Sequence, residues 1–226
     1  MADRSKQLII AIDGPAGSGK STVSKMVAKK LDLLYLDTGA MYRALTLKAM
    51  QAKLDLENEK QLIDMVKDTK IQIETRPRAK SIKVFLDGKD VTHKIRTPKL
   101  TDNIKYIAKV PGVRKCMVKM QRQIAAKKGA VLEGRDTTTV VFPDANYKFY
   151  LDANIAERSK RRFKDLSAIC VDISIEDVKE DVRVRDESDK TRKVAPLKKA
   201  EDAICIDTTN MSIDEVVDRI LSEVKS

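Results

Sequence analysis

Aromatic residues are scarce in this chain of 226 residues: tryptophan is absent, and Phe, Trp and Tyr together make up 4%. No segment interleaves aromatic with basic residues, which argues against a surface on which nucleic-acid bases stack. The net charge is +11, but the basic residues are spread along the chain among 34 acidic ones. We therefore interpret the positive charge as serving small phosphorylated ligands rather than nucleic acid.

Cysteine is also rare, and long apolar runs are missing. Cys116, Cys170 and Cys205 are odd in number and scattered, so the sequence supports neither a disulfide framework nor a zinc site, and we expect reduced thiols. No apolar run approaches the roughly 20 residues that span a bilayer, and the segment 1–7 is short and polar. We expect a cytoplasmic protein with no membrane partner.

The most informative motif is G-x-x-x-x-G-K-S, which directly follows an apolar, β-branched run at 8–12. This is a phosphate-binding P-loop in its required context, between a strand and a helix. Its backbone N–H groups and the helix N-terminus suit a triphosphate, for which we expect ATP. Lys20 would reach the β- and γ-phosphates, and Ser21 would ligate Mg²⁺. The predicted ATP-binding residues are Gly14, Pro15, Ala16, Gly17, Ser18, Gly19, Lys20, Ser21 and Thr22.

The rest of the chain alternates short apolar strands with helical patterns. Strands are predicted at 8–12, 33–36, 130–132, 148–151 and 203–206, and helices at 20–31, 113–127, 155–165 and 212–224. Such alternation indicates an α/β fold with a doubly wound, five-stranded parallel sheet. Ser212 and Glu215 occupy capping-box positions at the start of the last helix.

One region breaks the alternation. Short strands at 71–74, 82–86 and 91–95, with Asp87-Gly88 as a turn, predict a small antiparallel meander. We interpret it as an insertion beside the active cleft, although periodicity alone is equally compatible with a surface hairpin without a role. The expected organisation is one domain with a core at 1–60 and 107–226, an insertion at about 61–106 and a helical lid at about 156–190.

Several clusters of charged and polar residues are candidates for an acceptor site. Thr38 and Tyr42 lie one helical turn apart, and Arg135-Asp136 follows a strand at the edge where open α/β sheets bind ligands. Two further clusters have helical spacing: Arg185, Asp189 and Arg192, and then Arg158, Arg161 and Arg162. Each cluster taken alone is more typical of a solvated helix face or a structural ion pair.

Taken together, these segments resemble the bacterial cytidylate kinase family over nearly the whole chain. The similar segments are the P-loop with Asp13-Gly14-Pro15, the run from Leu36 to Arg43, Gly134-Arg135-Asp136, the run from Thr139 to Ala145, Arg185-Asp186 through Arg192 to Leu197, Ile206 to Thr209, and Ser212 to Glu215. The family's three-stranded insertion matches the predicted meander. The resemblance implies a monomeric kinase that transfers the γ-phosphoryl group of ATP to CMP or dCMP, with Mg²⁺.

The resemblance also implies roles for individual residues. Thr38, Arg43 and Arg135 would bind the CMP phosphate, with Tyr42 lining the pocket. Arg114 and Asp136 would read cytosine, because a carboxylate accepts a hydrogen bond from its exocyclic amino group whereas uracil presents an oxygen there. Arg185 and Asp189 would hold the sugar hydroxyls, and Arg192 would lie near the phosphates. The expected catalytic residues are Lys20, Arg158, Arg161, Arg162 and Arg192. Of these, Arg158, Arg161 and Arg162 would lie on a lid.

The chain departs from the family pattern at two positions. Thr138 stands where the family usually has glycine, and Lys105 aligns with a small hydroxyl residue that helps to bind the base. Lysine only donates hydrogen bonds, so it could contact a carbonyl oxygen of either pyrimidine. Three alternatives remain open: a P-loop nucleotide switch, a nucleic-acid-dependent ATPase, and a kinase for another monophosphate such as UMP. The guanine signature Asn-Lys-x-Asp, which a GTP-binding switch would carry, is missing from the sequence.

Overall fold

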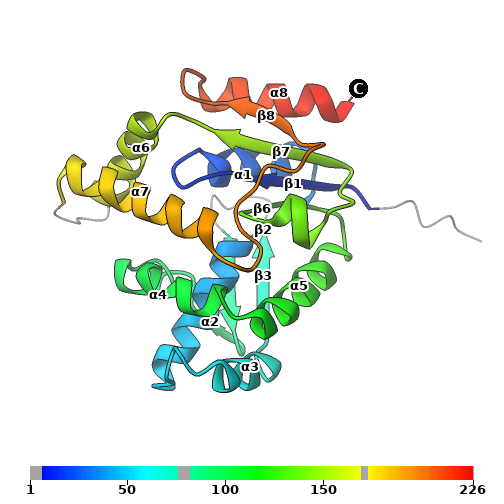
Figure 1. The fold of residues 1–226 in the computed structure, drawn as a ribbon. Helices are drawn as coiled ribbons and strands as arrows, with labels where there is room; N and C mark the ends of the chain where they lie inside the picture. The colour runs from blue at the N-terminus through cyan, green and yellow to red at the C-terminus, as the bar shows by residue number, and fades with distance from the viewer. Residues whose placement is uncertain (1–6, 76–81, 169–172, 226) are drawn as a thin grey trace, which may run out of the picture.

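A computed structural model describes residues 7–75, 82–168 and 173–225 (Figure 1). Its main sheet contains β1 (Ile9–Asp13), β2 (Leu34–Asp37), β6 (Ala130–Gly134), β7 (Tyr147–Asp152) and β8 (Ile204–Asp207), in the order β2-β6-β1-β7-β8. All four pairings are parallel. Each strand lies within two residues of its predicted range, and the five-stranded doubly wound sheet is confirmed.

The sheet is buried because helices cover it. β6 is buried along its whole length, and Ile10, Ile12, Phe149 and Leu151 are fully inaccessible. Continuous apolar strands of this kind are typical of a parallel sheet that is covered on both faces. The surrounding helices are α1 (Lys20–Lys30), α2 (Thr38–Gln51), α3 (Glu59–Lys67), α4 (Pro98–Ala108), α5 (Pro111–Ala125), α6 (Ile155–Ser167), α7 (Ile175–Thr191) and α8 (Ile213–Lys225).

Side-chain caps explain several helix starts. Asp37, the last residue of β2, accepts a hydrogen bond of 2.8 Å from the N–H of Ala40 and so begins α2 directly after the strand. The predicted capping box is confirmed at α8: Ser212 N donates to the Glu215 carboxylate at 2.7 Å, and Glu215 N donates to Ser212 Oγ at 3.3 Å. Helices α3 and α4 were not predicted from the sequence.

The insertion forms a separate antiparallel sheet of β3 (Ile71–Thr75), β4 (Ile82–Leu86) and β5 (Lys89–Asp90). The connector 76–78 lies outside the described residues. The prediction of a third strand at 91–95 was wrong, because that segment is a turn. The Asp90 carboxylate accepts from Thr92 N and Thr92 Oγ1, and Thr92 Oγ1 accepts from Val84 N at 3.0 Å, so a side chain takes the place of a strand partner.

The insertion is not a detached hairpin. Val84 is fully buried, and Ile82 and Leu86 join the same apolar core as the parallel sheet. In Figure 1 the small sheet, α3 and α4 make up a lower lobe, on the far side of the main sheet from α8. The insertion therefore packs against the main sheet and extends its apolar core.

Helices α6 and α7 lie side by side (Figure 1) and share a small apolar cluster of their own. Leu166, Val178 and Val182 are its buried members, and Ile155, Phe163 and Ile173 pack against them. Because this cluster is separate from the main core, the helix pair is held together by its own contacts. Within the described residues, no helix combines the length and apolar character needed to cross a bilayer.

The separate cluster predicts independent opening of the helix pair. We expect Val178→Ala to cost roughly 1–2 kcal/mol and to accelerate amide hydrogen exchange about 5–30-fold in α6 and α7 only. Val131→Ala in β6 serves as the matched control and should instead accelerate exchange across the main sheet. Equal acceleration in both regions by Val178→Ala would contradict an independent cluster.

Candidate nucleotide-binding site

The P-loop lies where the strand order reverses. β1 is bordered by β6 and β7, and the chain leaves β1 for β2 on the far side of β6. Open α/β sheets bind ligands at such a switch point, outside the carboxyl ends of the strands. Gly14 has a φ of 151°, and a Cβ there would lie 2.0 Å from the carbonyl oxygen of Leu151 on β7. Only glycine fits this first position of the loop.

Lys20 begins α1 and is almost completely buried. Its ammonium donates to the carbonyl of Pro15 at 2.6 Å and to Ser18 Oγ at 3.1 Å, so it folds back over the loop. Burial, with the positive charge of Arg135 as the next contribution, lowers the pKa of Lys20 to about 7. The charged form is therefore disfavoured until an anion lies beside it.

Two carboxylates lie beside the loop. Asp37 and Glu133 are register partners at the ends of β2 and β6, and Tyr35 donates a hydrogen bond of 2.5 Å to Glu133. Burial, followed by the charge of Asp37, raises the pKa of Glu133, while Lys20 and a hydrogen bond from Ser21 oppose this shift. A hydroxyl and carboxylates are the hard oxygen ligands that Mg²⁺ prefers. The residues present thus fit a magnesium ion, held by Ser21 with Glu133 and Asp37 beside it.

Sequence reasoning placed only Ser21 at the metal. The sequence carried a signal for Asp37 and Glu133, because each directly follows a predicted strand at the edge where ligands bind. Their pairing across β2 and β6 depends on the strand order, which the sequence did not reveal.

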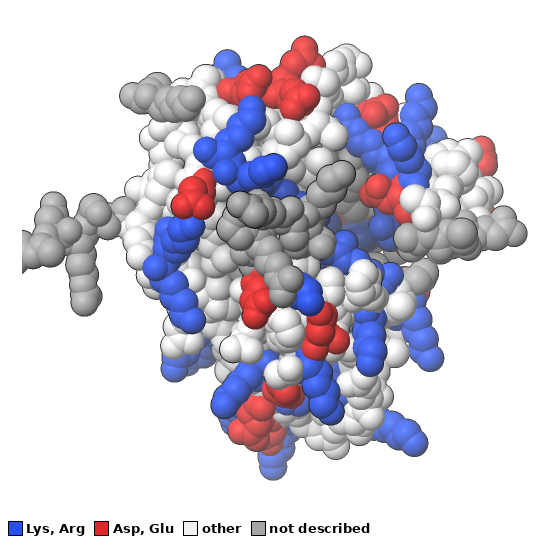
Figure 2. Space-filling view, turned by 180° about the vertical axis from the view of Figure 1, so that it is seen from behind, with Lys and Arg blue, Asp and Glu red and all other residues white. Residues whose placement is uncertain are grey.

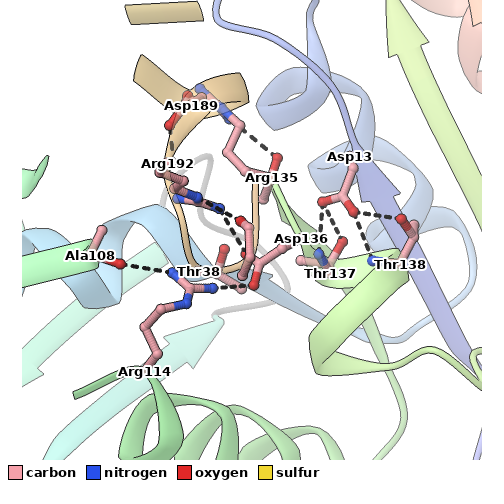
Figure 3. A network of polar contacts seen from close by, with 12 residues as sticks. Asp13, Thr38, Ala108, Arg114, Arg135, Asp136, Thr137, Thr138, Asp189 and Arg192 are labelled. Atoms are coloured by element: carbon pink, nitrogen blue, oxygen red, sulfur yellow. Dashed lines mark hydrogen bonds and ion pairs between the residues drawn. The ribbon is translucent and has the colours of Figure 1, made fainter. Parts of the chain in front are cut away.

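A second group of polar contacts surrounds Asp136, directly after β6 (Figure 3). Arg114 on α5 donates to the Asp136 carboxylate and, at 3.2 Å, to the carbonyl of Ala108. Arg192, just past α7, lies 3.6 Å from Asp136, and its guanidinium also lies 3.9 Å from Asp189. Burial raises the pKa of Asp136, although Arg114 and Arg192 both oppose the shift. This carboxylate lies between two arginines, one on α5 and one just past the end of α7.

Tyr42 packs against this group. The Arg114 guanidinium lies 5.6 Å from the centre of the Tyr42 ring, and burial raises the pKa of Tyr42 to about 12. A neutral aromatic face beside a carboxylate and a guanidinium suits a flat, polar-edged ring such as a nucleobase.

An arginine cluster lies between the P-loop and Asp136. Arg135 donates to Asp189 at 2.7 Å. Burial, and then the positive charges of Arg135 and Arg43, lower the pKa of Arg185 to about 9. The pKa of Arg43 is also lowered by burial, with Asp37 opposing the shift. Because burial and the charge of Arg135 both disfavour the charged forms of Arg43 and Arg185, a bound anion would stabilise these side chains.

The three arginines predicted on the lid have different surroundings. Arg158 is buried and donates to Ala153 O at 2.8 Å, to Ala16 O at 3.0 Å and to Asp186 at 2.5 Å. Arg161 donates to Glu157 at 3.0 Å and to Thr208 O at 2.7 Å. Both side chains therefore support the loop and its neighbours in this structure. Arg162 instead lines the cleft, and its buried Nε has no hydrogen-bond partner within the described part of the chain.

The cleft has a volume of about 430 Å³ and is bordered by four parts of the molecule. The core, α2, the insertion and α6 line it with Ser21, Thr22, Lys25, Asp37, Ala40, Arg43, Ile95, Arg96, Thr97, Thr101, Arg162, Asp165 and Leu166. Lys25 and Arg96 were not predicted as site residues. Figure 2 shows Lys and Arg side chains scattered among Asp and Glu on the face opposite to the view of Figure 1.

Two other predicted site residues, Thr38 and Lys105, lie outside these groups of contacts. Thr38 is buried and donates to the backbone carbonyl of Glu133 at 2.7 Å, which joins the start of α2 to the end of β6. Lys105 is exposed on α4, and its ammonium lies 5.3 Å from the ring centre of Tyr106. Its role at the base edge stays a prediction.

A five-stranded parallel sheet with a P-loop at its switch point, flanking helices and a small antiparallel sheet define a P-loop protein of the kinase fold. The fold is shared with shikimate kinase from Bacteroides thetaiotaomicron, at a TM-score of 0.50 and 12% identity over 98% of this chain and 100% of that one. It is also shared with an uncharacterized protein from Eubacterium ventriosum, at a TM-score of 0.55 and 16% identity over 97% and 99%.

The chain belongs to the cytidylate kinase family, whose model matches residues 10–226. It is 50% identical to the cytidylate kinase of Anoxybacillus flavithermus over 97% of each chain. It is 48% identical to that of Desulforamulus reducens over 96% of each chain. The resemblance drawn from the sequence motifs is confirmed.

The lowered pKa of Lys20 predicts proton uptake when a triphosphate binds. At pH 8 the buried lysine is mostly neutral, and an adjacent phosphate would restore its ordinary pKa, so that about 0.9 proton is taken up. Calorimetric titration with ATP in buffers of different ionisation enthalpy measures this uptake. Lys20→Met should abolish the dependence on buffer. A buffer-independent heat in the parent protein would show that Lys20 is already charged.

Proposed function

We propose that this protein transfers the γ-phosphoryl group of ATP to CMP or dCMP, giving ADP and CDP or dCDP. The observation that carries the proposal is the arrangement at the switch point: a P-loop after β1 stands beside the Asp136 carboxylate that follows the adjacent strand β6. Membership of the cytidylate kinase family supports the same substrates.

Cytosine would be recognised by Asp136 and Arg114. An ionised carboxylate accepts a hydrogen bond from the exocyclic amino group of cytosine, whereas uracil would direct an oxygen at it. Arg114 can donate to the ring nitrogen and carbonyl of cytosine. Tyr42, whose ring packs against Arg114, would support the base.

The acceptor phosphate would be bound by the arginine cluster, with Thr38, Arg43 and Arg135 as its contacts. Arg185 and Asp189 would hold the sugar, and Arg192 would lie near the phosphates. Burial lowers the pKa of both Arg43 and Arg185, and the positive charge of Arg135 adds to each shift. This supports the assignment, because a bound dianion would stabilise the charged forms of both side chains.

Phosphoryl transfer needs no general base here. The second pKa of a phosphate monoester is about 6, so the acceptor is already mostly a dianion at neutral pH. Lys20 and Arg162 would neutralise charge on the transferred group, and Arg158 and Arg161 would join them if their present partners are released on closure. Bound at Ser21, Mg²⁺ would neutralise charge on the phosphates of ATP. The α6–α7 pair would exclude water as it closes.

We further propose that the protein acts as a monomer in the cytoplasm. The P-loop and the Asp136 group can be built from the described residues of a single chain, and the proposed substrates are free nucleotides.

The proposal is tested by a coupled assay with ATP and each of CMP, dCMP, UMP, AMP and GMP. We expect the highest kcat/KM with CMP or dCMP. Hydrolysis of ATP without transfer to any monophosphate would favour a nucleotide switch or ATPase, and a preference for UMP would overturn the cytidylate assignment.

Asp136→Asn tests base recognition specifically. An amide can turn either its oxygen or its amino group toward the base, so we expect kcat/KM for CMP to fall about 10–100-fold and the preference for CMP over UMP to fall at least about tenfold. The Kd for ATP should stay within about twofold. Asp189→Asn is the control, since it disrupts the contact with Arg135 and should affect CMP and UMP equally. An unchanged CMP to UMP ratio in Asp136→Asn would assign Asp136 to the structural ion pairs alone.

A further inference from the structure

Asp13, the last residue of β1, holds a carboxylate that is completely inaccessible to solvent. Its two oxygens share their contacts evenly (Figure 3). Oδ1 accepts from Thr137 N at 2.9 Å and Thr137 Oγ1 at 2.7 Å, and Oδ2 accepts from Thr138 N and Thr138 Oγ1, both at 2.7 Å. A buried carboxylate is tolerated only when such charge-assisted hydrogen bonds replace its hydration.

These contacts connect two sites. Asp13 precedes Gly14, the first residue of the P-loop, and Thr137 directly follows Asp136, which contacts Arg114 and Arg192. The threonines begin a short π-helix, η1 (Thr137–Val141), whose first turn is held at Asp13. The carboxylate therefore joins the root of the P-loop to the turn that carries Asp136.

The turn is also confined on its other side. A Cβ at Gly134 would lie 2.5 Å from Thr38 Oγ1 and 2.7 Å from Thr137 Cγ2, so the backbone already packs closely against both side chains. Thr38 in turn is hydrogen-bonded to the carbonyl of Glu133. Between this contact and Asp13, the segment 134–138 has little room to shift.

We propose that Asp13, together with the hydroxyls of Thr137 and Thr138, acts as a positioning group that holds Asp136 in register with the P-loop. None of the three touches substrate in this assignment; they act through Asp136. Of these three residues, Thr138 gives the clearest test. The glycine expected at this position from the family resemblance would keep the backbone N–H contact with Asp13 and would lack the hydroxyl contact. The inference rests on the proposed function, since it concerns the base-recognising carboxylate.

Thr138→Val tests the hydroxyl while keeping the shape of the side chain, and Thr138→Ser restores a hydroxyl. In Thr138→Val we expect kcat/KM for CMP to fall about tenfold, because Asp13 Oδ2 loses one of its two donors in a dry environment. The CMP to UMP ratio should fall at least about threefold, with the Kd for ATP within about twofold of the parent. Thr138→Ser should recover most of the loss. Thr69→Val, which removes a buried hydroxyl bonded to Met65 O on α3, is the matched control and should leave all three quantities unchanged.

A double-mutant cycle separates positioning from general destabilisation. If Thr138 acts through Asp136, adding Thr138→Val to Asp136→Asn should lower kcat/KM for CMP by less than about twofold further, because the effects of residues in one hydrogen-bonded network are not additive. An equal loss in both backgrounds, equal losses toward CMP and ATP, or a Thr138→Val protein with parental kinetics would each overturn the inference. A parent protein that does not phosphorylate CMP would instead refute the proposed function, so the two failures are distinguishable.

Discussion

The position of β1 between β6 and β7 is the constraint on which the rest of the structure depends. It places the residues after β1 and those after β6 at one edge of the sheet, as neighbours, although more than a hundred residues separate them in the chain. The P-loop and Asp136 are brought together by this pairing alone. The register of β1 against β6 places Asp13 opposite Gly134, so the Asp13 side chain can reach the turn that follows β6.

Charge is the second organising feature. Burial opposes the charged forms of Lys20, Arg43 and Arg185, and the positive charge of Arg135 adds to each of these pKa shifts. A cluster of this kind is tolerated because the fold buries it at a ligand site, where bound phosphate groups would supply the missing negative charge. The same groups would then stabilise the charge that spreads over a transferred phosphoryl group.

The helix pair α6–α7 has its own apolar cluster and also contacts the P-loop. Its apolar cluster is independent of the main core, yet Arg158 and Asp186 tie it to the P-loop: Arg158 donates to Ala16 O, and Asp186 accepts from Ala16 N at 3.2 Å. Movement of the pair would therefore be transmitted to the loop itself.

The sequence by itself determined the local features: the P-loop, the parallel strands with their helices and the capping box at Ser212, because each depends on residues close together in the chain. It failed at 91–95, where Asp90 and Thr92 side chains replaced a strand pairing that periodicity predicted. Motif resemblance named Arg114 and Asp136, but their contact, the pairing of Asp37 with Glu133 and the four hydrogen bonds to Asp13 depend on strand order and helix packing. Only the tertiary structure decides such contacts, because they join segments whose separation along the chain carries no information about their distance in space.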